Sequence, residues 1–325
     1  MIQTNSRVND CTHNAIEALR SITACSCKRS RTVFPAAHWN VNFDHPDLAQ
    51  TKSAANVLRS CGYRPVTARQ ISDTIALIFA RCKTEGLETV SVPVPFCRAT
   101  DALLRCPRGL FLTLFGPDGV GKSSISSAAV GALSPLFDHQ RTVCWRPQLI
   151  GSRIAKEPHK FKLPHDASPH GRVTSLVKIT GACLDFFLDH ATLTRNQLRG
   201  CSLIVWDRYI YDLAVDEKRY RYCGPSWYPD LLLRWLPIPE HFLGIVLDAD
   251  EKTIFSRKRE LTPDELQRQR SAYRRLTACL PETHVVKNDG DFDFCLRRVL
   301  SLVINRMSSW FEPVTDELLA FGSAS

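Results

Sequence analysis

The clearest structural signal in this sequence lies at residues 110–123, which read Leu110-Phe-Leu-Thr-Leu-Phe115-Gly116-Pro-Asp-Gly-Val-Gly121-Lys122-Ser123. The first six residues are almost wholly apolar, which is typical of a strand buried on both faces of a sheet. A glycine-rich turn follows, and residues 123–133 then have the composition of a helix that ends before Pro135. The segment therefore predicts a strand, a tight loop and a helix in direct succession.

The turn fits the pattern GxxxxGK[ST], the P-loop of nucleotide-binding proteins. Its three glycines permit the positive φ angles that turn successive backbone N–H groups inward, toward a phosphate. The N-terminus of the following helix adds its dipole at the same point. We therefore expect ATP to be bound by Gly116, Pro117, Asp118, Gly119, Val120, Gly121, Lys122, Ser123 and Ser124. Within this set, Lys122 is placed to reach the β- and γ-phosphates and Ser123 to hold Mg²⁺.

Beyond residue 108 the pattern is regular. Four more runs resemble buried strands, at residues 141–145, 203–206, 242–247 and 284–287, and helical stretches separate them. One long helix is indicated by an apolar stripe at spacings of three and four, formed by Val173, Leu176, Val177, Leu184, Phe187 and Leu188. Parallel neighbours require crossover connections, so this alternation predicts a parallel sheet of about five strands covered on both sides. We expect a three-layer α/β domain of the P-loop kinase type at residues 109–325.

Residues 1–108 form a separate N-terminal extension in this interpretation, and its role is unknown. Helical periodicity covers residues 47–60 and 71–83, so we expect a mainly helical segment. Residues 90–95 alternate valine with two prolines, which is typical of an extended connector or an edge strand. Asp44 and Asp47 invite a metal site, but no Gly-Ser turn flanks them, and solvated loop carboxylates are the better interpretation.

Composition excludes several classes of function. The net charge is +9, but residues 1–108 hold 14 Lys and Arg against 8 Asp and Glu, and no basic block interleaves with aromatics. Dedicated nucleic-acid binding is therefore not expected. The 13 cysteines are scattered without zinc-ligand spacing, which favours buried free thiols. No apolar run approaches the ~20 residues of a membrane span, and the N-terminus lacks the apolar centre of a secretory signal. We expect a cytoplasmic protein.

Two aspartates compete for the second metal-side position beside Ser123. Asp207 and Asp248 each follow a predicted strand, at the edge where open α/β sheets bind ligands. Asp207 is followed by Arg208 and Tyr209, which brings a carboxylate, a cation and an aromatic surface together. Asp248 can simply cap the next helix. We therefore assign Asp207 to the Mg²⁺ shell.

A P-loop alone does not separate a kinase from a GTPase or a motor ATPase. No Asn-Lys-x-Asp element for guanine is present, and a kinase of small molecules needs a mobile lid rich in arginine. Such a lid is indicated at residues 256–265, which end in a capping box with proline at the first helical position. We assign Arg257 and Arg259 to the phosphates, and Arg274 and Arg275 to a solvated helix face.

These motifs resemble the thymidylate kinase family of P-loop kinases. The resemblance rests on the loop from Phe115 to Ser124, the triplet Asp207-Arg208-Tyr209 and the passage from Val246 into the arginine lid. It is stronger for the thymidylate kinase-like proteins of bacterial surface-polysaccharide loci, and it covers residues 109–307. The segments shared with those proteins are Trp145-Arg146-Pro147, Pro169-His-Gly-Arg172, Tyr209–Tyr222 and the lid region from Glu260 to Tyr273.

The resemblance also implies an acceptor site. Asp118 matches the carboxylate that contacts the acceptor's sugar hydroxyl in thymidylate kinases, and Arg208 matches an arginine that faces the acceptor phosphate. Arg146 and Tyr209 complete the expected site. The family's Arg-Glu-Pro-Gly-Gly segment is replaced by Trp145-Arg-Pro-Gln-Leu-Ile, and the residues that usually follow the Asp-Arg-Tyr triplet are missing. Those segments build the thymine pocket.

The sequence thus predicts an ATP- and Mg²⁺-dependent kinase of a small acceptor, either a nucleoside monophosphate or a sugar-containing metabolite. Lys122 and the lid arginines would stabilise the transferred phosphoryl group, and Asp118 and Arg208 would orient the acceptor. Asp118 would also serve as base if the acceptor is a hydroxyl. The alternative is a nucleotide-binding regulatory or assembly protein without turnover, with residues 1–108 as its partner-binding surface. The oligomeric state is left open, with a homodimer as one option.

Overall fold

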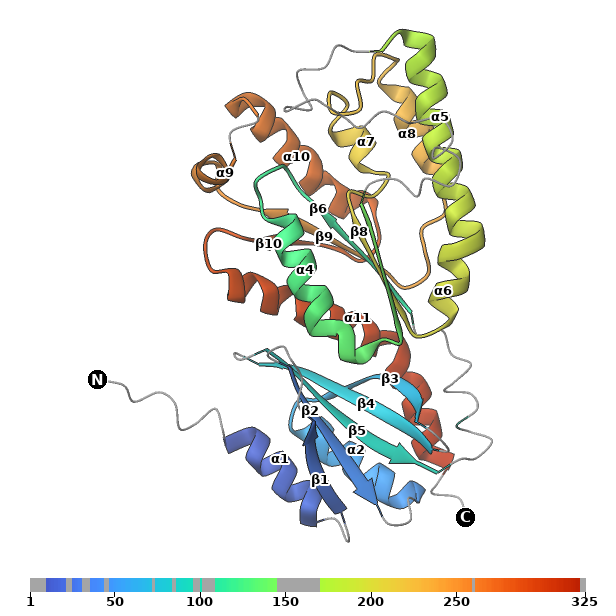
Figure 1. Cartoon of the computed structure of the whole chain (residues 1–325), viewed down its shortest axis with the longest axis vertical. Helices are drawn as coiled ribbons and strands as arrows, with labels where there is room; N and C mark the ends of the chain where they lie inside the picture. Colours follow the sequence, from blue (N-terminus) through green and yellow to red (C-terminus); the bar gives the residue numbers. More distant parts are fainter. Residues whose placement is uncertain are drawn as a thin grey trace, which may run out of the picture. The chain divides into compact units, whose positions relative to one another are not determined.

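The computed structural model divides the chain into two compact units (Figure 1). It describes residues 10–21, 25–30, 36–43, 47–71, 74–83, 86–95, 100, 109–144, 170–258 and 261–321. The N-terminal unit comprises residues 1–108, 131–138 and 297–325, and the P-loop unit comprises residues 109–130 and 139–296. The C-terminal 29 residues thus group with the N-terminal unit, whereas the sequence placed them in the P-loop domain.

The P-loop unit is built on a five-stranded parallel sheet. Its strands are β6 (Leu110–Phe115), β7 (His139–Cys144), β8 (Ser202–Asp207), β9 (Phe242–Asp248) and β10 (Thr283–Lys287). Their spatial order is β10-β9-β6-β8-β7, and every neighbouring pair is parallel. The predicted α/β fold is confirmed, and all five strands lie where the sequence placed them to within two residues. Because β6 is central, the loop that follows it emerges at the middle of the sheet's carboxyl edge.

Helices cover both faces of this sheet. The helices along this part of the chain are α4 (Lys122–Leu133), α5 (Arg172–Asp189), α6 (Arg195–Arg199), α7 (Asp212–Val215), α8 (Trp227–Arg234), α9 (Glu251–Arg257) and α10 (Pro263–Cys279), with a π-helical turn at His190–Thr194. A 3₁₀ turn at Ser134–Leu136 follows α4 and belongs to the N-terminal unit. Figure 1 shows α4 in front of the sheet and α10 behind it. On the α10 side, α5, α6 and α10 contribute to one apolar cluster centred on Phe111, Trp206 and Phe242. The rings of Trp206 and Phe242 both stack on Phe111, with centroids 5.7 and 6.0 Å away.

The long helix α5 buries a different face from the one its sequence suggested. Val173 and Val177, both in the predicted apolar stripe, are 75% and 66% exposed. The buried positions are instead Ile179, Cys183 and Phe186, which pack into the core cluster. Both sets recur with a helical period, so periodicity predicted the helix but did not say which face meets the sheet.

The N-terminal unit contains a second five-stranded sheet. Its strands are β1 (Cys25–Ser30), β2 (Ala36–Phe43), β3 (Arg64–Ile71), β4 (Thr74–Lys83) and β5 (Gly86–Val94), in the order β1-β2-β5-β4-β3. All pairs are antiparallel except β2 with β5. One face packs against α1 (Asp10–Ser21), α2 (Leu48–Ser60) and the later part of α11 (Phe292–Phe321), through apolar residues such as Leu19, Leu58 and Phe311.

The expectation of a mainly helical N-terminal extension is therefore wrong. Residues 71–83, predicted as a helix, contain strand β4, whose residues 75–80 are all buried. A continuous apolar run fits a buried helix and a central strand equally well, and here two neighbouring strands decide. The valine- and proline-rich segment is strand β5, paired on both sides and not at an edge. Its Pro93 lies beyond Ser91, the last residue paired with β2, so the missing N–H costs no bond there.

Three smaller predictions can be compared with the structure. Asp47 is the N-cap of α2, and its carboxylate accepts from the Gln50 N–H at 2.6 Å. Asp44 lies outside the described residues. Of the cysteines in the described ranges, Cys183, Cys201 and Cys295 are buried free thiols as expected, whereas Cys144, Cys223 and Cys279 are exposed. No helix within the described ranges is long and apolar enough to cross a membrane.

Candidate active site

The P-loop has the backbone that its glycines predicted. Gly116, Gly119 and Gly121 have φ angles of 139°, 86° and 97°, which side chains rarely adopt. Space is also limiting, because a Cβ on Gly116 would lie 2.5 Å from the Leu247 carbonyl oxygen. A Cβ on Gly121 would lie 2.7 Å from the Asn288 side-chain nitrogen. The loop is therefore a backbone cradle of the kind that holds phosphates.

Lys122 lies inside this cradle. Its side chain is 5% exposed, and its Nζ donates to the carbonyls of Gly116 and Pro117 at 2.6 and 2.9 Å. Burial lowers the pKa of Lys122, with a contribution in the same direction from Arg208, while Asp118 and Asp207 oppose the shift. The ammonium is thus held among loop oxygens at the place where a triphosphate would meet it.

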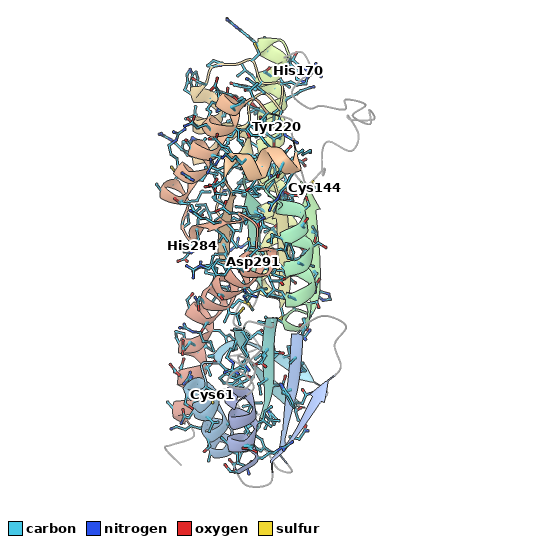
Figure 2. All side chains as sticks on the ribbon, turned by 90° about the vertical axis from the view of Figure 1, so that its left-hand side faces the viewer. Cys61, Cys144, His170, Tyr220, His284 and Asp291 are labelled. Atoms are coloured by element: carbon cyan, nitrogen blue, oxygen red, sulfur yellow. The ribbon has the colours of Figure 1, made fainter. Side chains whose placement is uncertain are left out.

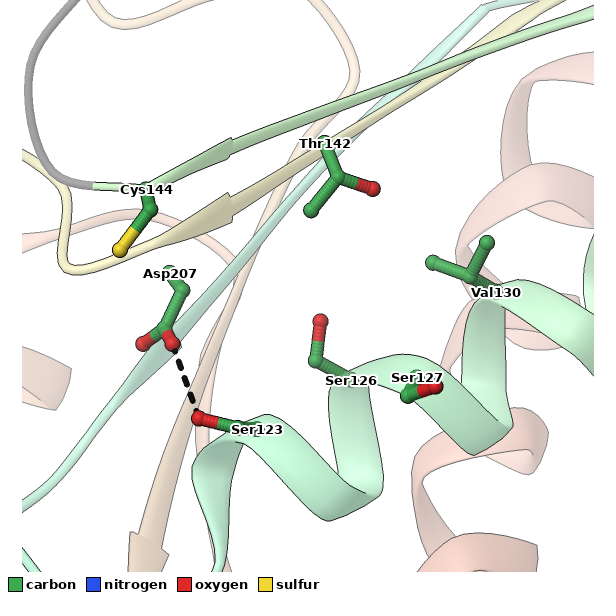
Figure 3. A pocket seen from close by; sticks show the side chains of 7 residues that line it. All are labelled: Ser123, Ser126, Ser127, Val130, Thr142, Cys144 and Asp207. Carbon is green, nitrogen blue, oxygen red and sulfur yellow. Dashed lines mark hydrogen bonds between the residues drawn. The ribbon is translucent and has the colours of Figure 1, made fainter.

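Ser123 and Asp207 meet at the start of α4. The Ser123 hydroxyl donates to Asp207 Oδ2 at 3.3 Å (Figure 3). Within the described residues, the other carboxylate oxygen, Oδ1, is buried without a hydrogen-bond partner. Both residues line a pocket of about 250 Å³ together with Ser126, Ser127, Val130, Thr142 and Cys144.

These atoms suit a magnesium ion. Mg²⁺ prefers oxygen ligands and usually keeps several waters, so one hydroxyl and one carboxylate suffice from the protein. The unpartnered Asp207 oxygen is the kind of group that a cation would satisfy. Cys144 is a poor ligand, because burial and the Asp207 charge raise its thiol pKa and keep it neutral. Ser123 and Asp207 therefore fit the role that the sequence gave them.

Asp118, within the P-loop, is surrounded by cations. Arg208 donates to its Oδ1 and Arg219 to its Oδ2, and Lys122 Nζ lies 3.5 Å from Oδ1. Burial alone would raise the pKa of Asp118, but the charges of Lys122, Arg208 and Arg219 outweigh burial and lower it. Such a carboxylate is a weak base. Asp118 is therefore unsuited to the role of general base that the sequence left open for a hydroxyl acceptor.

Arg219 was not predicted from the sequence. It lies in the turn at residues 217–221 that follows α7. There its backbone N–H donates to Asp216 Oδ1 at 3.2 Å and its Nε to Asp216 Oδ2 at 3.3 Å. The only signal for it was its place in the Tyr209–Tyr222 segment that carried the resemblance. Because 101 residues separate it from Asp118, spacing alone could not pair the two.

In the Asp-Arg-Tyr triplet at the end of β8, Asp207 and Arg208 belong to the candidate site, whereas Tyr209 belongs to the hydrophobic core. Arg208 has a φ of 66°, a left-handed conformation that costs a non-glycine residue roughly 1–2 kcal/mol. Such strain is typical of functional sites. Tyr209, which the sequence placed at the acceptor, is 4% exposed and packs edge-on against Phe111 and Phe186. Its ring is part of the core, so a direct contact with a ligand is not indicated.

The end of α9 lies against the P-loop. Arg257 Nη1 donates to the Val120 carbonyl at 3.4 Å, and Asn288 Nδ2 donates to the same oxygen at 2.7 Å. A Cβ on Gly119 would lie 3.0 Å from Lys258 Cβ. The structure thus brings Arg257 to the loop, as the lid interpretation requires. Arg259 and Arg146 lie outside the described residues.

Helix α10 is linked to the end of β9 by arginines. Asp248 accepts from Arg270 Nε at 2.7 Å and from Arg274 Nε at 3.1 Å. Burial would raise the pKa of Asp248, but these hydrogen bonds lower it. Asp248 is not the cap of α9, which is Asp250, and Arg274 is not simply solvated. On the same helix, Arg268 Nη2 lies 2.7 Å from Glu265 Oε1.

Another carboxylate of this unit, Asp212, is buried. Its Oδ1 accepts from the Tyr273 hydroxyl at 2.6 Å, and its Oδ2 is buried without a partner among the described residues. Burial raises the pKa of Asp212 to about 6, although the charge of Arg208 opposes the shift. Tyr220, labelled in Figure 2, packs against the neighbouring core cluster.

Comparison with known proteins identifies no family. No protein-family model matches the chain, and no curated protein matches it. Among the solved structures that match is the thymidylate kinase from Ehrlichia chaffeensis, which is 15% identical. The match covers 60% of this chain and 98% of that chain, with a TM-score of 0.42.

Proposed function

We propose that the chain is an ATP- and Mg²⁺-dependent kinase that phosphorylates a small acceptor. The observation that carries the proposal is the arrangement around β6: a cradle of three positive-φ glycines, Lys122 inside it, and the Ser123–Asp207 pair beside it. These three elements are the donor side of a P-loop phosphoryl-transfer site. None of them depends on the comparisons.

Each residue has a defined task in this proposal. Lys122 neutralises charge on the β- and γ-phosphates, and Arg257 approaches the same phosphates from α9. Ser123 and Asp207 would hold Mg²⁺, which when bound would offset the negative charge of the phosphates. Asp118 and Arg208 face the acceptor. Since phosphoryl transfer needs little covalent chemistry from the protein, rate would come from positioning and charge neutralisation.

The acceptor is proposed to be a nucleoside monophosphate or a sugar-containing metabolite. The proposal draws on the resemblance to thymidylate kinases and to the thymidylate kinase-like proteins of bacterial surface-polysaccharide loci. The weak basicity of Asp118 favours an acceptor whose attacking oxygen is already ionised, because a hydroxyl would need a base.

An acceptor screen tests the proposal. ADP release would be measured with a coupled assay in the presence of Mg-ATP and each of a series of nucleoside monophosphates and sugar phosphates. We expect at least one acceptor to stimulate ADP release well above the rate in its absence. Tight ATP binding with no stimulation by any acceptor would support the alternative, a nucleotide-binding regulatory or assembly protein.

A further inference from the structure

Two arginines from different segments converge on one carboxylate in the P-loop unit. Arg208 follows β8 and Arg219 follows α7, and each donates to a different oxygen of Asp118. Asp118 is 9% exposed, and the two arginine side chains are 16% and 18% exposed. The pair is thus largely enclosed but reachable from solvent.

The two guanidinium groups have donors to spare. A guanidinium carries five N–H donors, and the hydrogen bonds of the described residues use Nη2 of Arg208 together with Nε and Nη2 of Arg219. Within the described ranges, Asp118 is the only carboxylate at salt-bridge distance from Arg208. Lys122 adds a third positive charge 3.5 Å from the same aspartate. Arg219 also pairs with Asp216, whose Oδ2 lies 3.3 Å from its Nε. Among the described residues, Nε and Nη1 of Arg208 and Nη1 of Arg219 make no hydrogen bond, so the cluster has N–H groups that a second anion can use.

We propose that Arg219 acts with Arg208 to bind the anionic group of the acceptor, which is a phosphate monoester, and that Asp118 holds the two guanidinium groups in convergence. The proposal rests on the proposed kinase function and adds to it a specificity-determining residue and the charge class of the acceptor.

The geometry and chemistry favour a phosphate over a neutral group. Arginine forks match the oxygens of phosphate, and such charge-assisted bonds are about twice as strong as neutral ones. The transfer brings an anionic acceptor close to the γ-phosphate, so the acceptor's charge must be offset at the site. Two arginines fixed by a buried carboxylate supply that charge without reorganisation.

Arg219→Ala and Arg219→Lys test the proposal by binding, with no need for turnover. Calorimetry would be carried out on the full chain with Mg²⁺ and a nonhydrolysable ATP analogue. Nucleoside monophosphates and sugar phosphates would each be compared with the parent compound that lacks the phosphate. We expect Arg219→Ala to weaken binding of the phosphate-bearing compounds by about 10–100-fold, as loss of a charged hydrogen bond implies. Arg219→Lys should weaken it less, and affinity for the parent compounds should stay within about twofold.

The control is Arg199→Ala, because Arg199 is an exposed arginine of α6 in the same unit. It should change neither affinity. The melting temperature of each variant shows whether it is folded. If Arg219→Ala does not fold, Arg219→Lys is compared with the wild type in its place. A purely structural role would weaken phosphate-bearing and parent compounds alike, which would overturn the proposal. So would wild-type protein that binds no phosphate-bearing compound more tightly than its parent.

The outcomes also separate this inference from the kinase proposal. An Arg219-dependent preference for phosphate with no ADP release would leave the inference standing and remove the kinase function. If an acceptor stimulates ADP release and Arg219→Ala leaves the KM for that acceptor unchanged, the kinase function stands and the inference about Arg219 is wrong.

Discussion

Asp118 belongs to the P-loop and Asp207 contacts its last residue, Ser123, yet the surroundings of the two aspartates differ in kind. Asp118 is held by two arginines and a lysine, so both its oxygens are occupied. Asp207 receives one hydroxyl hydrogen bond, and its second oxygen is buried without a partner in the described part of the chain. A carboxylate surrounded by cations serves to position them, whereas a carboxylate with an unsatisfied oxygen is ready to receive a cation. The two residues are chemically identical, so their different roles follow from the groups that surround each carboxylate.

The largest effect is expected at Lys122, which lies between the two aspartates. Lys122→Ala should lower the rate of phosphoryl transfer by at least about 10²–10³-fold, because it removes a positive charge from the transferred phosphoryl group. The Lys122 side chain is buried, so the variant also leaves two loop carbonyls without their donor. Circular dichroism should still show a folded protein.

The control for this prediction is Lys252→Ala, at an exposed lysine of α9, which should keep the wild-type rate. Near-normal turnover in Lys122→Ala would contradict the account of the donor side.

Asp212 extends the comparison to a buried carboxylate that has no cation at salt-bridge distance among the described residues. Its pKa is raised to about 6 in the folded chain, against an ordinary value of 3.8. Between these pH values the folded state binds more protons than the unfolded state, so stability falls as pH rises. Asp212→Asn cannot titrate and should remove this fall. The difference in unfolding free energy between variant and wild type should therefore grow by roughly 2 kcal/mol from pH 4 to pH 7.

Urea unfolding at the two pH values measures that difference. Asp230→Asn, at an exposed aspartate of α8, is the control and should leave the pH dependence unchanged. An equal difference at both pH values would show that Asp212 is not the titrating group.

The comparison itself is tested by exchanging each aspartate for asparagine. Asp207→Asn should raise the Mg²⁺ concentration needed for half-maximal ADP release by about 10–100-fold, as loss of a group that supports a metal site does. Asp118→Asn should leave the Mg²⁺ requirement unchanged and raise the KM for the acceptor instead. If both variants required the same Mg²⁺ concentration, Asp207 would have no special role in holding the metal, and the contrast with Asp118 would be wrong.

The acceptor side also predicts that dTMP is a poor substrate. The segment at residues 145–150 and the residues after the Asp-Arg-Tyr triplet lack the form found in thymidylate kinases. We expect turnover with dTMP at micromolar concentration to fall well below that of the best acceptor in the screen. Turnover with dTMP that equals the best acceptor would show that another part of the chain binds thymine.

The smallest effect is expected at the lid. Hydrogen exchange across residues 255–270 should slow when a nonhydrolysable ATP analogue binds, because the triphosphate attracts the cations of this segment. Arg257→Ala should lose rate more than ATP affinity, and Arg275→Ala, at an exposed arginine of α10, should lose neither. Unchanged exchange under saturating analogue would mean that these arginines form a solvated face.

How far the sequence predicts the structure differs between the two units. In the P-loop unit, glycine spacing and short apolar strands predicted the sheet, the loop and the Ser123–Asp207 pair, because all of these follow from local pattern and strand order. In the N-terminal unit the same kind of apolar run gave a wrong prediction of a helix. Residues 74–80 form a strand because they pair with β3 and β5. Arg219 and the Asp248–Arg270 contact join segments far apart in the chain, which no spacing rule reaches.

The central claim is that this chain transfers a phosphoryl group from ATP to a small acceptor. Its most direct test is the rate of ADP release with Mg-ATP, measured with and without each acceptor, in the wild type and in Lys122→Ala. The account predicts stimulation by at least one phosphate-bearing acceptor in the wild type and loss of that stimulation in the variant. ADP release that no acceptor stimulates, in a wild-type protein that binds ATP tightly, would contradict it.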